Sequence, residues 1–235
     1  MALIKFGGGI THMSGSIAGN TFARNRFGSY VRSRTKPVNP NTVLQNQTRS
    51  RIGFLTQYWR ATLTAPERTA WETYAASIAW LNKLGEATYL TGFNMFVGCN
   101  SNRLWAEKPL VAAGPTVLAL PENDPTISVT ATVLPPYLSI AYDDTLPWCT
   151  DPQAYLVASM GEPQSKTRNF FAGPWKYIGR TLGNSGTPPD SPWTTAAPYT
   201  LVLGQKSWFK FRIGRGDGRI SREFAASAIV TAGTP

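Results

Sequence analysis

The spacing of apolar residues changes from a helical period in residues 37–108 to strand alternation after residue 122. Seven short alternating or β-branched segments follow Glu122, separated by Pro- or Gly-rich breaks such as "TPPDSP" and "GRGDGR". The segments are TISVTATVL, LSIAYDD, QAYLVASMG, KYIGRTLG, PYTLVLG, SWFKFRIG and EFAASAIVTA. Seven short strands in about 110 residues are typical of an antiparallel sandwich of immunoglobulin or fibronectin type III style. The chain lacks the Cys–Trp–Cys spacing of an antibody-type domain.

Residues 37–108 carry the helical part of the pattern. Two prolines in "KPVNPNT" end the preceding segment, and Asn41 or Thr42 can cap a first helix. Thr64 and Glu67 form a capping box for a second helix, and a third helix is expected across "TGFNMFVGCNSNRLWAE". The aromatic residues expected in the helical core are Trp59 and Trp71.

Residues 1–36 have the pattern of an extended basic arm or β-ribbon. Two runs of strand-forming residues flank "NRFG", which predicts a turn between two strands. The second run predicts one basic face, with Tyr30, Arg32 and Arg34 on that face and Val31, Ser33 and Thr35 on the other. A two-stranded hairpin is marginally stable in water and leaves edges unpaired, so the arm is expected to pair with or pack on another surface.

The segment "PLVAAGPTVLALP", residues 109–121, is the predicted linker. The predicted fold is therefore α+β. Its parts are an extended N-terminal arm or β-ribbon (1–36), a small helical domain (37–108), the linker (109–121) and a C-terminal antiparallel Ig-like β-sandwich (122–235).

Positive charge is concentrated in the first quarter of the chain. The net charge is +10, and residues 1–60 hold nine basic residues and no acid, since the first acid is Glu67. The rest of the chain holds 14 basic residues against all 13 acidic ones. Only 15% of residues are charged, against about 25% in an average soluble domain, which favours apolar surface available for partners.

The titratable residues do not suggest a catalytic, metal or cofactor site. His12 is the only histidine, which argues against histidine-based triads and most metal sites. The glycines in "MALIKFGGG" lack the Lys-Ser/Thr of a phosphate loop. Cys99 and Cys149 fit no zinc spacing and are expected as two buried thiols. "GRGD" contains the tripeptide of integrin ligands, but a tight turn between two strands is the better interpretation.

No apolar run approaches the ~20 residues that a membrane helix needs, and the first residues lack the apolar region of a signal peptide. The chain is therefore expected to be made in a cytoplasm and to have no membrane partner.

Two partners suit the basic arm. Its arginines are interleaved with Phe22, Phe27 and Tyr30, which could stack on nucleic-acid bases while arginines bind phosphates. Alternatively, the arginines pair with groups on neighbouring subunits while the strands extend a neighbour's sheet. Because the arginines are spread over a long segment and no DNA-reading module is present, protein assembly is favoured, with DNA contact as a second role.

Several motifs occur in order between residues 15 and 75. They are "GSIAGNTFARNRFGSYVRSRT", "KPVNPNTVLQNQ" and "LTAPERTAWETYA". This part of the chain resembles a family of structural proteins encoded by tailed bacteriophages and prophages. The predicted sandwich is a looser likeness to the Ig-like modules that decorate phage particles. The resemblance implies a virion component and supplies no catalytic residues.

The resulting hypothesis is a non-enzymatic structural protein of the virion. Its arm and helices would dock on a ring or shell at the neck, collar, portal vertex or tail, and its sandwich would be displayed. Its partners would be other virion proteins and copies of itself. The expected inter-subunit contacts are Phe22, Arg24, Arg26, Tyr30, Arg32 and Arg34.

Two rival hypotheses remain open. One is a nucleic-acid-binding protein inside the phage head, which would use the same arginines. The other is a host-surface adhesin whose sandwich binds glycan through exposed tryptophans. The candidate tryptophans are Trp148, Trp175, Trp193 and Trp208.

Overall fold

Each helix of the protein begins at a threonine that caps it. The computed structural model describes residues 2–134 and 136–233, and within them lie α1 (Val43–Ala61), α2 (Ala65–Ser77) and α3 (Gly92–Trp105). The hydroxyls of Thr42, Thr64 and Thr91 each accept a hydrogen bond from the third backbone N–H of the helix. The caps predicted at Thr42 and Thr64 are confirmed, and both are complete capping boxes. No helix in the described ranges is long and apolar enough to cross a bilayer.

The three helices enclose an apolar core around Trp71. Trp71 and Phe96 have no exposed surface, and their rings meet edge to face at 5.5 Å. Trp59 is half-buried, with its ring 5.4 Å from that of Phe96. The predicted core position of Trp71 is confirmed, and Trp59 lies at the margin of the same core.

A β-hairpin interrupts the helical part of the chain, where the sequence predicted helices alone. It consists of β5 (Ala79–Leu81) and β6 (Ala87–Tyr89), paired antiparallel between α2 and α3. The turn between them includes Gly85 at a φ of +79°, a value that glycine adopts without strain. The Asn82 carboxamide oxygen accepts hydrogen bonds from the Leu84 and Glu86 backbone N–H groups, which closes the turn.

Two antiparallel sheets form a β-sandwich in the C-terminal half. Within the described residues of this half, the strands are β7 (Ser128–Thr132), β8 (Tyr137–Ala141), β9 (Tyr155–Gly161), β10 (Trp175–Leu182), β11 (Trp193–Ala196), β12 (Lys206–Gly214) and β13 (Phe224–Ile229). One sheet has the order β10-β9-β12-β13 and the other β11-β8-β7. The fourth strand, β10, thus joins the sheet of the third, whereas in constant-type immunoglobulin domains it joins the sheet of the first and second.

The core between these sheets is built from alternate residues of each strand. Leu138, Leu156, Phe209 and Phe211 are almost fully buried in it. The fold is therefore α+β with a β-sandwich. One predicted strand is wrong: 198–204 ("PYTLVLG") is not a strand, and β11 takes its place in the sheet by pairing with β8. In that segment Leu201 is buried while the next two apolar residues are exposed, so the segment does not alternate as a strand would.

The N-terminal arm is a small sheet rather than a two-stranded ribbon. Residues 2–33 form β1 (Ala2–Ile4), β2 (Gly15–Ile17), β3 (Asn20–Asn25) and β4 (Gly28–Ser33), in the order β1-β4-β3-β2. The turn predicted at "NRFG" is confirmed, because Asn25 pairs with Gly28 across it. The edge strands β1 and β2 are only three residues long, and this length is too short for an alternation pattern to be recognised.

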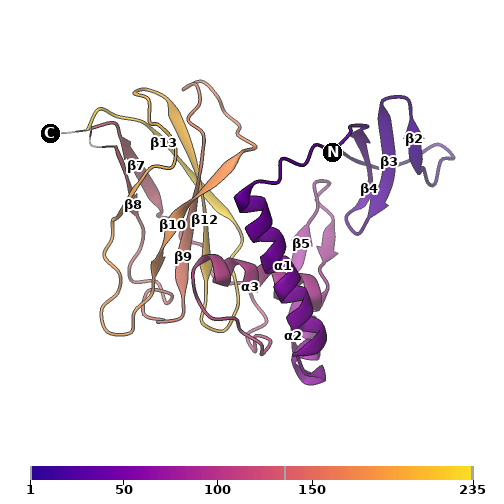
Figure 1. The fold of residues 1–235 in the computed structure, drawn as a ribbon, viewed down its shortest axis with the longest axis horizontal. Coiled ribbons are helices and arrows are strands. Elements are labelled where there is room, and N and C mark those ends of the chain that lie inside the picture. The colour runs from indigo at the N-terminus through magenta and orange to yellow at the C-terminus, as the bar shows by residue number, and fades with distance from the viewer. Residues whose placement is uncertain (1, 135, 234–235) are drawn as a thin grey trace.

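The helical part and the sandwich are joined by buried contacts. Ile220, in the turn between β12 and β13, is part of the helical core. Arg103, at the end of α3, donates hydrogen bonds to the carbonyls of Pro109 (2.9 Å) and Arg215 (2.7 Å). The segment 109–121, predicted as a linker, is anchored by a hydrogen bond from the Trp71 indole to the Ala112 carbonyl. Figure 1 shows the helices lying between the sandwich and the N-terminal sheet, which are at opposite ends of the longest axis.

Candidate inter-subunit surface

The strand register divides the predicted contact residues between two faces of the N-terminal sheet. Phe22 lies opposite Val31, and Arg24 opposite Ser29, so these residues share one face. Tyr30 and Arg32 belong to the other face. The prediction of a single basic face is therefore wrong, because β3 and β4 pair in a register that places Arg24 and Arg32 on opposite sides.

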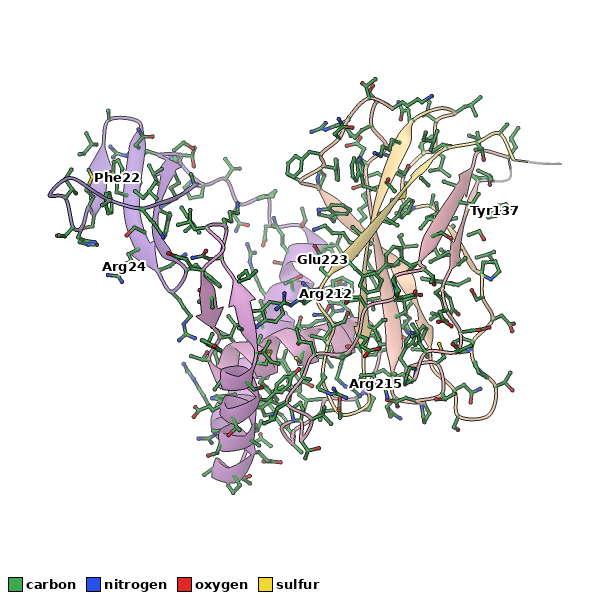
Figure 2. The ribbon with its side chains drawn as sticks, turned by 180° about the vertical axis from the view of Figure 1, so that it is seen from behind. Phe22, Arg24, Tyr137, Arg212, Arg215 and Glu223 are labelled. Atoms are coloured by element: carbon green, nitrogen blue, oxygen red, sulfur yellow. The ribbon has the colours of Figure 1, made fainter. Side chains whose placement is uncertain are left out.

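A crossover loop covers the face that carries Phe22. Since β1 and β2 are the two edges of the sheet, residues 5–14 must cross β4 and β3 to connect them. A cavity on this side is lined by loop residues Lys5 to Gly7 together with Ile4, Arg24 and Ser29, which places the loop on the Phe22 face. In Figure 2, Phe22 and Arg24 lie one below the other along the N-terminal sheet.

The opposite face, which we call the open face, lies on the side of the sheet away from the crossover loop. Register places Leu3, Thr21, Ala23, Tyr30 and Arg32 on it. Leu3, Ala23 and Tyr30 are half-buried by their neighbours within the sheet, and Arg32 is exposed. The open face thus presents an apolar centre with a cation at its margin, a composition that suits a protein surface.

No side chain between residues 2 and 54 is buried. The first buried residue along the chain is Leu55, in the middle of α1. A sheet in which no side chain is buried has little hydrophobic stabilisation of its own. The sheet and the first half of α1 therefore have much surface that a partner could cover.

The first half of α1 continues the exposed apolar surface. Val43 is 71% exposed, Leu44 60% and Phe54 51%, although the helix lies against α3 further along. Arg49 does not bind an acid here, but donates to the side chains of Asn39, Asn41 and Asn46. The exposed apolar residues adjoin the sheet in sequence, so one partner surface could cover both.

Positive charges on the sheet are mostly unpaired. Within residues 2–134 and 136–233, the side chains of Arg24, Arg32, Arg34 and Lys36 make no hydrogen bond or ion pair. In contrast, several cations of the sandwich and its neighbouring segments have acidic partners. These pairs are Arg180–Glu107, Lys210–Glu223, Arg215–Asp151 and Arg219–Asp217. Figure 2 shows Arg212 and Glu223 together, far from Arg24.

The sheet contacts the rest of the chain through the β5–β6 hairpin. Arg26, in the β3–β4 turn, donates to the carbonyl of Tyr89 at 2.9 Å, and Asn82 donates to the carbonyl of Phe27 at 3.1 Å. Lys5 and Glu86 form an ion pair at 2.5 Å. Arg26, expected as an inter-subunit contact, thus has a partner in its own chain.

The ion pair lowers the pKa of Glu86. The main cause is the hydrogen bond from Lys5, and the bond from Asn82 acts in the same direction. Sequence reasoning missed Asn82, Glu86 and Tyr89. The alternation of "AWLNKLGEATYL" around an Asn and a Gly is the signal that could have identified this hairpin.

The four candidate tryptophans of the sandwich do not form an open aromatic platform. Trp148 is 2% exposed, and Trp193 is half-buried against the core. Trp175 and Trp208 are on the outer face of the four-stranded sheet, where an ammonium group lies over each ring. The distances to the ring centres are 4.4 Å for Lys210 over Trp175 and 4.2 Å for Lys206 over Trp208.

The remaining sequence motifs have structural positions. "GRGD" lies in a turn closed by the Gly214–Ile220 bridge, and Gly218 of this turn faces Trp71, so the turn interpretation is confirmed. Cys99 and Cys149 are buried and unpaired, and burial raises the pKa of each thiol to about 12. Among residues 2–134 and 136–233, no group of three or more His, Cys, Asp and Glu side chains could hold a metal ion.

Comparison with known proteins gives a limited result. No protein-family model and no curated protein sequence matches the chain. Among solved structures, the chain is similar to a Fn3-like protein from Clostridium thermocellum, with 12% identity and a TM-score of 0.30. The match covers 50% of this chain and 98% of that one. The β-sandwich is established here by its strand order and not by this likeness.

Proposed function

We propose that the chain is a non-enzymatic structural subunit of a tailed-phage particle, located at the neck, collar, portal vertex or tail. The observation that carries the proposal is the absence of any buried side chain in residues 2–54, a segment that nevertheless forms four strands and half a helix. The sequence resemblance is the reason for assigning the chain to a phage particle, and the exposed sheet is the surface through which we expect it to dock.

Assembly would stabilise the ordered structure of residues 2–54. Burial of apolar surface on a neighbour offsets the conformational entropy that an exposed sheet loses on folding. The open face offers Leu3 and Tyr30 for this purpose, and α1 adds Val43 and Phe54. The unpaired arginines at the margin would pair with carboxylates or carbonyls of the neighbour.

The shape of the chain suits docking at one end and display at the other. The sheet and the sandwich lie at opposite ends of the long axis, separated by the helices (Figure 1). A neighbour held by the sheet would leave the outer loops of the sandwich accessible. We therefore expect the sandwich to project from the ring or shell.

Deletion of residues 1–36 tests the proposal. Residues 2–36 include no buried side chain, so the free energy of unfolding of the remaining body should stay within about 1 kcal/mol of the parent value. Particles assembled with this variant should lack the chain. A matched control deletes the exposed loop 185–188, which should leave incorporation unchanged. Incorporation of the 1–36 deletion at normal copy number would refute the proposal.

The unpaired cations favour a second candidate function, contact with packaged DNA. If Arg24, Arg32, Arg34 and Lys36 each bind a phosphate, the slope of log affinity against log salt should be about −3.6. The double variant Arg32→Gln/Arg34→Gln should then reduce the steepness of this slope by about 1.8. Binding to duplex DNA that is insensitive to salt would exclude this role. For the adhesin hypothesis, the positions of the sandwich tryptophans offer no comparable support.

A further inference from the structure

The N-terminal sheet is attached to its own chain by contacts in which no side chain of the sheet is buried. Phe27, in the β3–β4 turn, lines a cavity with Trp80 and Met95 but stays 38% exposed. The sheet reaches the β5–β6 hairpin through the Arg26–Tyr89 and Asn82–Phe27 hydrogen bonds and the Lys5–Glu86 ion pair. All of these hydrogen bonds are exposed, and the sheet contributes no residue to a buried core cluster. The helices and the sandwich, in contrast, share a core through Ile220.

The connection between the sheet and α1 is long, exposed and extended. Residues 34–42 have no helix or strand, and every side chain in this segment is exposed. Val38 is 87% exposed, and Pro37 and Pro40 stiffen the chain on both sides of it. At about 3.1 Å per residue for proline-rich chain, the nine residues can span roughly 28 Å. In Figure 1 this segment runs as an extended, irregular stretch of chain from the sheet to the start of α1.

Because the connection is long and exposed, it would allow the N-terminal sheet to leave its own hairpin and dock on the hairpin of another copy. If the sheet of one copy docks on the hairpin of another, the same donors meet the same acceptors, and no buried contact is broken. The hairpin also retains exposed apolar side chains, with Leu81 64%, Leu84 42% and Tyr89 51% exposed. A neighbouring copy could cover these residues, which would favour the exchanged arrangement over the closed one.

Charge selects the hairpin as the surface for the sheet. Two N-terminal sheets would repel each other, because residues 2–33 hold four cations and no acid. The hairpin carries one acid, Glu86, which already pairs with Lys5, and one cation, Lys83. A second copy therefore offers a carboxylate for Lys5 at its hairpin and only cations at its sheet.

We propose that copies of this chain exchange their N-terminal sheets, so that the sheet of each copy docks on the β5–β6 hairpin of the next. This inference rests on the proposed assembly function and names the partner of the sheet. The contact joins two different surfaces, so it is a heterologous interface, which closes into a ring or continues as a helical array according to its rotation.

Cross-linking between singly substituted chains tests the exchange. Lys5→Cys and Glu86→Cys are made in separate chains, one of them tagged, and the two are mixed at high concentration. A short bis-maleimide is then added, while Cys99 and Cys149 remain protected by burial. Exchange predicts a covalent product that contains both chains, at twice the 25.7 kDa chain mass. A mixture of Lys5→Cys with Thr187→Cys, an exposed position of the sandwich, gives the random background.

The outcomes separate this inference from the proposed function. The Lys5→Cys/Glu86→Cys double variant reports the closed arrangement, because there the link forms within one chain. Mixed single variants that stay at one chain mass, while the double variant links internally, would overturn the exchange. Sedimentation of the same samples shows whether copies associate. Association with internal links only would leave self-assembly standing and remove the exchange alone.

Discussion

Removal of the buried cation at the centre of the molecule should loosen the sandwich from the helices. Arg103 is 1% exposed and is surrounded by carbonyl oxygens instead of carboxylates. Its guanidinium donates to Pro109 and Arg215 at 2.9 and 2.7 Å, and more weakly to Gln153 at 3.5 Å. Burial lowers the pKa of Arg103, although the group stays charged at neutral pH because arginine starts from a very high value.

The size of the effect follows from these contacts. Two good hydrogen bonds from a charged donor contribute about 1.5–3 kcal/mol each, which gives about 3–6 kcal/mol in total. Part of this is offset, because the variant no longer buries a charge. The Arg215 carbonyl also keeps a second donor, the Gly218 N–H at 3.1 Å. For Arg103→Met, which retains most of the side-chain volume, we expect a net loss of about 2 kcal/mol.

Guanidinium unfolding followed by tryptophan fluorescence measures this loss. The midpoint of Arg103→Met should fall, and the transition should broaden or split as the helices and the sandwich lose their shared contact. Arg60→Met is the matched control, since Arg60 is an exposed arginine of α1 and should change stability by less than about 0.5 kcal/mol. An Arg103→Met midpoint equal to that of the parent would refute the argument that this buried cation joins the two parts.

Two further predictions concern packing and pH. Gly161→Ala should lower the free energy of unfolding by about 1–3 kcal/mol, because the new Cβ would lie 2.2 Å from the Phe171 ring. Gly53→Ala, in open space on α1, should raise it by about 0.5–1 kcal/mol, and calorimetry distinguishes the two signs. The contribution of the Lys5–Glu86 ion pair to docking of the sheet should be fully present above the unperturbed pKa of Glu86 and should be lost as pH falls through its lower folded-state pKa, while the Arg26–Tyr89 and Asn82–Phe27 hydrogen bonds remain. Amide chemical shifts of Lys5 and Glu86 measured against pH check this, and shifts that do not change together would contradict it.

Local signals predicted the helices well. The capping box of Thr64 with Glu67 depends on residues three positions apart and forms as expected. The first helix was expected to be capped by Asn41 or Thr42, and Thr42 caps it in a capping box with Gln45 that was not predicted. The aromatic stripe that placed Trp71 in the core also depends on neighbours along one helix. Most strands of the sandwich could be predicted for a similar reason: in β12, for example, every second side chain from Ser207 to Ile213 is buried. β11 was not predicted, and the segment 198–204 was predicted as a strand instead.

Non-local pairings explain what the sequence did not predict. β1 has three residues and no pattern of its own, and it becomes a strand only because Leu3 pairs with Tyr30. The hydrogen bond from Arg26 to the Tyr89 carbonyl joins residues 63 positions apart, so no spacing rule indicates it. Ile220 was expected to belong to the sandwich and instead contributes to the helical core. Such contacts depend on how helices and strands that are far apart in the sequence pack together. The periodicity of apolar residues within one segment carries no information about that packing.

The difference between local and non-local information also explains why the sequence identified the arm as basic but did not predict on which face of the sheet each arginine lies. Composition alone marks residues 1–60 as the basic part of the chain. Which face each arginine occupies depends on the register of β3 against β4, and a shift of one residue would reverse the face of Arg24. The register is fixed by the Asn25–Gly28 turn, where Gly28 adopts a φ of +118°. A residue with a side chain at position 28 would be strained at this φ. Its substitution for Gly28 would therefore disturb the register that places Arg24 and Arg32 on opposite faces.

The division between buried and exposed contacts also has a mechanical consequence for assembly. Arg103 and Ile220 join the helices to the sandwich from within, so separating those two parts would expose core. The N-terminal sheet is held by exposed contacts to the hairpin, so it can leave one copy and dock on another while the body stays folded. If the sheet had contributed a side chain to either core, exchange would require partial unfolding and would be slow. The helices and the sandwich thus form one body with a shared core, and the N-terminal sheet is a docking element that can bind the hairpin of its own chain or that of another copy.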